Sequence, residues 1–123
     1  MNRARWTALL GGVAFAACAF TEQGRSDRLR EMYPQGTARA DVIARFKAEP
    51  KISELRPAAG WVALPKPYLA ERVAGAEQRV GRSPARLDVY VAYPDGVFSL
   101  CNVWFYYDEN DRVLDTEWQY HSD

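Results

Sequence analysis

The sequence predicts an α+β fold in which two to three short helices pack on one face of a three- to four-stranded antiparallel meander sheet. Two observations lead to this prediction. Apolar residues recur at helical spacing in three segments, residues 29–33, 42–46 and 69–80, and from Leu87 onward they alternate with a period of two. The length of 123 residues, with 48% apolar and 26% charged residues, is that of one globular domain.

The charge balance narrows the classes of partner. The chain carries 16 Lys and Arg against 16 Asp and Glu, so its formal net charge is zero. A protein that binds nucleic acid needs an excess of cations to displace the counterions of the phosphates. We therefore predict no nucleic-acid partner.

Residues 1–17 are predicted to be a signal peptide. Arg3 and Arg5 form a short basic region, and residues 6–17 follow without a charge. As a helix this apolar run would rise about 18 Å, which is short of the roughly 30 Å hydrocarbon core of a bilayer. We therefore interpret the segment as an export signal and not as a membrane span.

The export signal ends in Phe15-Ala16-Ala17-Cys18, which resembles a bacterial lipobox. In such signals the cysteine is acylated and cleavage falls before it, so we expect lipidation at Cys18 and a short tether over residues 18–25. Acyl chains would hold the protein at the periplasmic face of the outer membrane. The alternative is ordinary cleavage after Ala19, which would give a soluble periplasmic or secreted protein. Residues 26–123 are predicted to form a single domain.

Two short helices are expected at the start of this domain. Ser26 is the predicted N-cap of the first helix, and Pro34 ends it. Thr37 is the predicted N-cap of the second helix, which ends at Pro50. The apolar stripes consist of Leu29, Met32 and Tyr33 in the first helix and of Val42, Ile43 and Phe46 in the second.

A short edge strand and a third helix are predicted next. Residues 61–64 are apolar and are bounded by Gly60 and Pro65, which indicates the strand. Pro67 suits the first turn of a helix, and Gly81 suits its C-cap. The helix over residues 67–80 is indicated by an apolar stripe of Leu69, Val73, Ala76 and Val80.

Three antiparallel strands are predicted over residues 87–93, 97–107 and 112–120. Pro94-Asp95-Gly96 and the acidic residues 108–111 are the turn signals between them. If Tyr93 pairs with Val97 and Tyr107 with Arg112, the register divides the side chains between two faces. The face expected to lie under the helices contains Val89, Val91, Cys101, Val103, Phe105, Leu114 and Trp118.

The second face of this sheet is unusually apolar for a surface that meets water. It contains Tyr90, Phe98, Leu100, Asn102, Trp104 and Tyr106. Either another part of the chain covers it, or it is a contact surface. Because Tyr and Trp are enriched at interface hot spots, we interpret one set of residues as a protein-binding site: Tyr90, Phe98, Leu100, Trp104 and Tyr106.

Catalytic residues, metal sites and cofactors are not predicted. The sequence contains no glycine-rich nucleotide motif and no paired-cysteine motif, and its single histidine, His121, lies near the C-terminal end. Asp115 and Glu117 share a strand face, where we expect a solvated edge, so an enzyme based on these carboxylates is the least favoured hypothesis. The acidic residues assigned to a solvated turn are Asp108, Glu109 and Asp111.

The stretch from Gly36 to Phe46, with Pro50 following, is similar to the SmpA/OmlA (BamE-like) small outer-membrane lipoproteins. The family has a Gly-x-Thr-x-x-x-Val helix start, a nearby Trp and a late strand that ends in an acidic turn; here Trp61 and residues 103–108 fill the last two roles. This chain departs from the pattern before Pro50 and in its additional helix over residues 67–80. The resemblance implies a β-lactamase-inhibitor-like fold, a protein-binding role and an outer-membrane location.

These observations favour a non-enzymatic, lipid-anchored periplasmic module that binds another envelope protein, as an accessory in outer-membrane assembly or maintenance. The alternative is a periplasmic inhibitor or small-ligand-binding protein, in which the Pro-rich residues 57–67 and the sheet form a groove.

Overall fold

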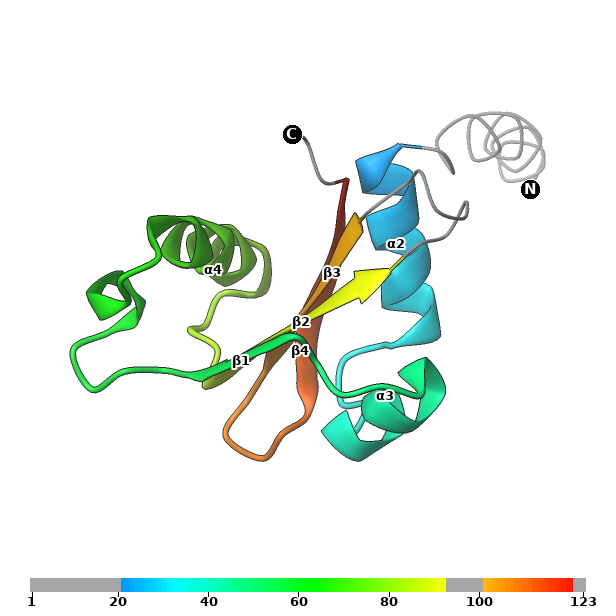
Figure 1. Cartoon of the computed structure of the whole chain (residues 1–123), viewed down its shortest axis with the longest axis horizontal. Helices are drawn as coiled ribbons and strands as arrows, with labels where there is room; N and C mark the ends of the chain where they lie inside the picture. Colours follow the sequence, from blue (N-terminus) through cyan, green and yellow to red (C-terminus); the bar gives the residue numbers. More distant parts are fainter. Residues whose placement is uncertain (1–20, 93–100, 121–123) are drawn as a thin grey trace, which may run out of the picture.

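An antiparallel sheet with the strand order β1-β2-β3-β4 forms the centre of the computed structural model, which describes residues 21–92 and 101–120 (Figure 1). This confirms the predicted α+β fold class. The elements are α2 (Glu22–Met32), α3 (Arg39–Phe46), β1 (Ile52–Leu55), the 3₁₀ helix η1 (Trp61–Ala63), α4 (Pro67–Val80), β2 (Arg86–Ala92), β3 (Cys101–Tyr107) and β4 (Val113–Tyr120). The predictions for residues 1–20, 93–100 and 121–123, which include Cys18, Phe98, Leu100 and His121, lie outside the described residues.

The register between β2 and β3 differs from the predicted one. The expected turn pairing would place Val89 opposite Cys101, whereas the structure pairs Val89 with Trp104 and Tyr90 with Val103. The difference is three residues, and an odd shift moves every side chain of one strand to the other face. Tyr90 therefore shares a face with Val103, and Val89 shares the opposite face with Trp104.

Helices cover both faces of the sheet (Figure 1). On one face α2 and α3 pack against a core of Leu29, Tyr33, Val42, Tyr90, Cys101, Val103, Phe105, Tyr107, Val113 and Trp118. On the other face η1 and α4 enclose Trp61, Leu69, Val73, Ala76, Leu87, Val89, Trp104 and Tyr106. The prediction of helices on one face thus holds for α2 and α3, and α4 adds a layer over the second. The chain covers much of its own apolar second face.

Helix α2 begins earlier than the sequence pattern predicted. Thr21 is its N-cap, and the Thr21 hydroxyl accepts a hydrogen bond from the Gly24 N–H at 3.0 Å. Ser26 is not a cap but lies buried in the second turn. The predicted tether over residues 18–25 therefore includes the first turn of a helix.

The second helix, α3, also begins at a different residue. It starts at Arg39 after Ala38, and no side chain caps it. The predicted cap, Thr37, donates its hydroxyl proton to the Pro34 carbonyl at 2.7 Å instead. The helix ends at Phe46, well before Pro50, because Lys47 adopts a left-handed conformation with φ of 56°.

The edge strand lies in a different segment from the one predicted. Residues 61–63 form η1, and Trp61 is buried with its indole N–H donating to the Pro84 carbonyl at 3.0 Å. The edge strand is β1, which pairs with β2 from Ile52 opposite Val89 to Leu55 opposite Arg86. The helix over residues 67–80 and its Gly81 cap, with φ of 77°, are confirmed.

Candidate functional site

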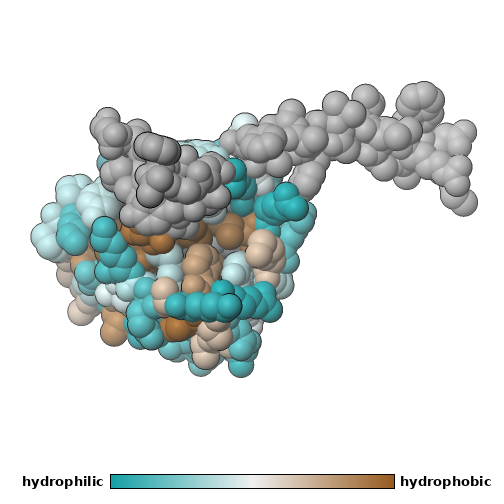
Figure 2. Space-filling model, turned by 45° about the vertical axis from the view of Figure 1, so that its right-hand side comes forward, coloured by the Kyte–Doolittle hydropathy of each residue, from teal (hydrophilic) through white to brown (hydrophobic). Residues whose placement is uncertain are grey.

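The predicted aromatic binding face does not exist as an exposed surface in the described residues. Tyr90, Trp104 and Tyr106 are each at most 2% exposed. The register places Tyr90 under α3, where its ring stacks on Phe46 at 4.4 Å, while Trp104 and Tyr106 lie on the α4 side. On the face shown in Figure 2, apolar residues are interspersed with hydrophilic ones. The interpretation of these three residues as a contact surface was therefore wrong.

Burial also affects the acidity of the core tyrosines. Desolvation raises the pKa of Tyr90 to about 12, with the charge of Asp88 as the next cause. The pKa of Tyr107 lies above its ordinary value of 10.0 for the same two reasons. Both hydroxyl groups are buried and have no hydrogen-bond partner within the described residues. These side chains thus contribute to the core as apolar rings.

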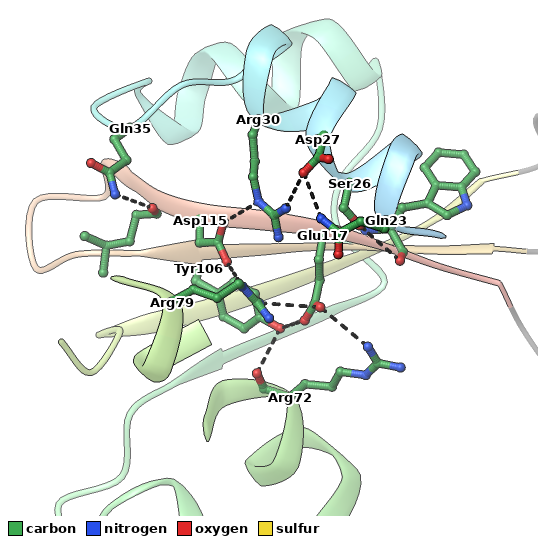
Figure 3. A network of polar contacts seen from close by, with 12 residues as sticks. Gln23, Ser26, Asp27, Arg30, Gln35, Arg72, Arg79, Tyr106, Asp115 and Glu117 are labelled. Atoms are coloured by element: carbon green, nitrogen blue, oxygen red, sulfur yellow. Dashed lines mark hydrogen bonds and ion pairs between the residues drawn. The ribbon is translucent and has the colours of Figure 1, made fainter. Parts of the chain in front are cut away.

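A buried polar cluster lies on the α4 side of β4, at the edge of the sheet (Figure 3). We define this polar cluster as Arg30, Arg72, Arg79, Tyr106, Asp115 and Glu117. Arg30 comes from α2, and Arg72 and Arg79 come from α4, so the cluster brings together residues from both helical layers. The two carboxylates come from β4 and are only 6% and 7% exposed.

Asp115 joins the two helical layers directly. Its Oδ1 accepts from Arg30 Nε at 2.9 Å, and its Oδ2 accepts from Arg79 Nε at 2.7 Å. The pKa of Arg79 is raised above its ordinary value, because the hydrogen bond and the charges of the two carboxylates outweigh desolvation, the largest single influence, which lowers it. A carboxylate held between two guanidinium groups is a structural ion-pair partner.

Glu117 occupies the second half of the cluster. Its Oε2 lies 3.4 Å from Arg79 Nη2 and 3.5 Å from Arg72 Nη1, and its Oε1 accepts from the Tyr106 hydroxyl. Desolvation, followed by the charge and hydrogen bond of Glu117, raises the pKa of Tyr106 well above its usual value. The phenol therefore stays neutral and acts as a donor to the carboxylate.

The expectation of a solvated edge around Asp115 and Glu117 was wrong. Both carboxylates are buried, because α4 covers them and arginines supply their partners. The arginines are 36 to 85 residues away in sequence, so no local spacing signals the pairing. This arrangement links helices across an edge strand, and an arginine-paired carboxylate is a weak candidate for proton transfer.

A third buried carboxylate, that of Asp88, is likewise paired with an arginine. Asp88 is fully buried on the α3 side, where it accepts from Arg39 Nε at 2.6 Å and from the Ser53 hydroxyl at 2.6 Å. Sequence analysis missed it, because a charged residue in an alternating strand indicates a solvent-facing position. Its partners fix α3 and β1 to the centre of the sheet.

Helix α2 covers the outer edge of β4. The Ser26 hydroxyl accepts from the Trp118 N–H at 2.9 Å and lies 3.5 Å from the Trp118 carbonyl oxygen. Glu22 accepts from the Tyr120 N–H at 2.9 Å, and the Gln35 side chain donates to the Leu114 carbonyl at 3.1 Å. Side chains thus satisfy backbone groups that an edge strand otherwise leaves available for pairing.

At the opposite edge of the sheet, the described residues provide no such cover. Arg56 N donates to Ala85 O at 2.9 Å, so its backbone faces β2. Backbone direction alternates along an antiparallel strand, so the N–H and C=O groups of Ser53 and Leu55 point away from β2. Within the described ranges, no other strand pairs with them. Both residues are exposed, Leu55 by 61%.

A groove of about 390 Å³ adjoins this open edge on the α4 side of the sheet. Lys51 and Ile52 bring it to the start of β1, and Tyr68 forms its rim at the beginning of α4. Its lining residues are Lys51, Ile52, Tyr68, Val89, Val91, Asn102, Trp104 and Gln119. The lining does not include the Pro-rich residues 57–67, which were predicted to form one wall.

The acidic hairpin turn is structural, as expected. Asp108 Oδ1 accepts from the backbone N–H groups of Asn110 and Arg112, at 2.8 and 3.0 Å. Glu109 pairs with Arg82 at 2.8 Å on the surface. No cluster of potential metal ligands occurs in residues 21–92 and 101–120, and no helix within these ranges is long and apolar enough to cross a membrane.

Comparisons with known proteins do not identify a relative: no family model, no curated protein and no solved structure matches this chain. The similarity of residues 36–46 to the SmpA/OmlA lipoproteins therefore stays a prediction.

Replacing Arg79 by Ala is expected to lower the free energy of unfolding by about 2 to 4 kcal/mol. The substitution leaves Asp115 and Glu117 buried with fewer partners. The expected loss of stability is smaller than for a fully buried ion pair, because the Arg79 side chain is 37% exposed. The matched control is Arg82→Ala, which removes a surface pair with Glu109 and should cost less than about 1 kcal/mol. Urea unfolding measures both, and similar losses would contradict a structural role for the cluster.

Alkaline pH should destabilise the fold through its core tyrosines. A tyrosine whose pKa is raised in the folded state confers stability that is complete below the unfolded pKa of about 10 and is lost as pH rises through the folded pKa. Each such tyrosine should cost about 1.4 kcal/mol per pH unit in that window. Urea unfolding at pH 8 and pH 11 measures this effect. At pH 8 the Tyr107→Phe variant should have the same free energy of unfolding as the parent protein. Between pH 8 and pH 11 its free energy of unfolding should fall less than that of the parent. The half-exposed Tyr68, changed to Phe, is the control, and equal alkaline losses in the two variants would refute this account.

Proposed function

We propose that this chain is a non-enzymatic, lipid-anchored periplasmic module that binds an extended segment of another envelope protein. The observation that carries the proposal is the open outer edge of β1 beside an apolar groove. Among the described residues, nothing pairs with the four outward backbone groups of Ser53 and Leu55, while α2 covers the opposite edge of the sheet. An exposed strand edge is a template for β-strand addition.

The neighbouring side chains indicate what kind of segment fits. Ile52 lies on the groove side of β1, so alternate side chains of an added strand would face the groove. The floor offers Val89, Val91 and Trp104 to an apolar anchor residue. Lys51 places a cation at the entrance, which favours an acidic residue next to that anchor.

The location is proposed from the N-terminal sequence. The signal peptide over residues 1–17 and the lipobox-like Cys18 support an acylated protein at the periplasmic face of the outer membrane. Together with the absence of a recognisable catalytic motif, they support a role as an accessory in outer-membrane assembly or maintenance.

A second candidate is favoured by the size of the groove. A cavity of about 390 Å³ falls in the range of small-molecule sites. In this case the occupant is a small amphipathic ligand, and β1 remains an unpaired edge. Native mass spectrometry of the purified protein would then show a retained small molecule.

Site-specific photo-crosslinking in cells that express the protein tests the leading proposal. A photoreactive residue in place of Tyr68, on the groove rim, should give one discrete protein adduct, and the same residue in place of Val62 should give none. Val62 is the matched control because it is 84% exposed but does not line the groove. Leu55→Pro should abolish the Tyr68 adduct, since it removes an outward N–H without removing a hydrogen bond to β2.

Unchanged thermal unfolding of Leu55→Pro establishes that the variant is folded. An adduct that persists in this folded variant, or one of equal strength from position 62, would contradict strand addition at β1.

A further inference from the structure

The start of α2 limits how far the domain can lie from a membrane anchor. Thr21 already caps the helix, so only residues 19 and 20 separate it from Cys18. The three steps from Cys18 to Thr21 span at most about 11 Å, because an extended residue covers about 3.6 Å. If Cys18 is acylated, as the proposed function holds, the N-terminal end of α2 lies at the level of the lipid headgroups.

The rest of the domain must follow α2, because the helix is fixed to the sheet. Ser26 and Glu22 bind the backbone of β4, and Arg30 binds Asp115. These contacts extend along the helix and leave little freedom for α2 to tilt away from the sheet. The end of the molecule where α2 begins and β4 ends therefore turns toward the bilayer (Figure 1).

The side chains at this end suit a headgroup layer. The Arg25 guanidinium lies over the rings of Trp118 and Tyr120, with its central carbon 5.0 and 5.8 Å from the ring centroids. A shallow cavity of about 160 Å³ is lined by Arg25, Arg28, Leu29, Met32 and Trp118, and it runs from this end along the side of α2. Tyr and Arg combine an apolar body with a polar end, and such residues are favoured at membrane interfaces.

We propose that this end of the domain docks on the phospholipid surface, with the partly exposed Tyr120 at the headgroup level and Arg25 near lipid phosphates. We call it the docking end and define it as Arg25, Arg28 and Tyr120, together with Trp118, which is buried beneath the Arg25 guanidinium. Docking gives the domain one orientation on the membrane. The β3–β4 turn, at the opposite end of the sheet, points into the periplasm.

Fluorescence quenching by lipids tests the orientation. The mature protein is placed in vesicles of phosphatidylethanolamine with a minority of phosphatidylglycerol, some of whose headgroups carry a nitroxide. One variant carries a fluorophore on a cysteine at Gln23, and the matched variant carries it at Asn110 in the β3–β4 turn. Cys101 is fully buried and does not compete for the label in the folded protein. The label at position 23 should be strongly quenched, and the label at position 110 should not.

A variant with a longer tether distinguishes docking of the domain on the membrane from attachment through the lipid anchor alone. With a flexible Gly/Ser insertion between residues 20 and 21, the label at position 23 should remain quenched, because the docking end itself holds the surface. Adding Arg25→Gln should weaken the association about fivefold, which is the contribution of one basic residue near an anionic surface. The control is Arg45→Gln, since Arg45 also covers an aromatic ring, Tyr33, at 5.2 Å, but lies on α3; it should leave quenching unchanged.

The outcomes distinguish the two proposals. An intact mass without acyl chains would refute the anchor and hence the proposed location. An acylated protein with equal quenching at positions 23 and 110, or one that loses quenching when the tether is lengthened, would overturn the docking end while the anchor stands.

Discussion

Hydrogen bonds from α2 to the outer edge of β4 determine which edge of the sheet remains open. Ser26 and Glu22 occupy backbone groups of Trp118 and Tyr120. Further along the helix, Arg30 reaches Asp115, which also binds Arg79 of α4. This edge is therefore closed on its outer side and fastened to both helical layers. Within the described residues, the strand edge without such hydrogen bonds is that of β1, at the other end of the strand order.

The two-layered cover explains why the aromatic residues do not form a binding surface. Central strands that are apolar on both sides need a layer of helices on each face. Helix α4 supplies the second layer and buries Trp104 and Tyr106, but it leaves a groove open beside Ile52 and Val91. The polar cluster satisfies the charges that α4 buries at the margin of this layer. The proposed binding site is consequently the edge of β1 and the groove beside it, and not the aromatic face.

Local patterns predicted β2, β3, β4 and α4 well, because a period of two, a Pro at the helix start and Gly81 at its end are signals within one segment. They missed β1 and predicted an edge strand where the structure has η1. The register between β2 and β3 could not be predicted from such local signals. It depends on the turn between β2 and β3, and an error of three residues placed Tyr90 beside Trp104 when they lie on opposite faces. Asp88 and Asp115 resembled solvent-facing residues, since their arginine partners are distant in sequence. The α2 start was missed because Thr21 and Ser26 are both good caps, and only the packing against β4 decides between them.

Amide hydrogen exchange measured by NMR tests most directly the claim that one edge of the sheet is closed and the other open. The N–H groups of Trp118 and Tyr120 point outward from an edge strand, yet they should exchange slowly because Ser26 and Glu22 accept from them. The N–H groups of Ser53 and Leu55 should exchange rapidly in the unbound protein. Fast exchange at Trp118, or protection at Ser53 and Leu55 equal to that of β4, would contradict this account.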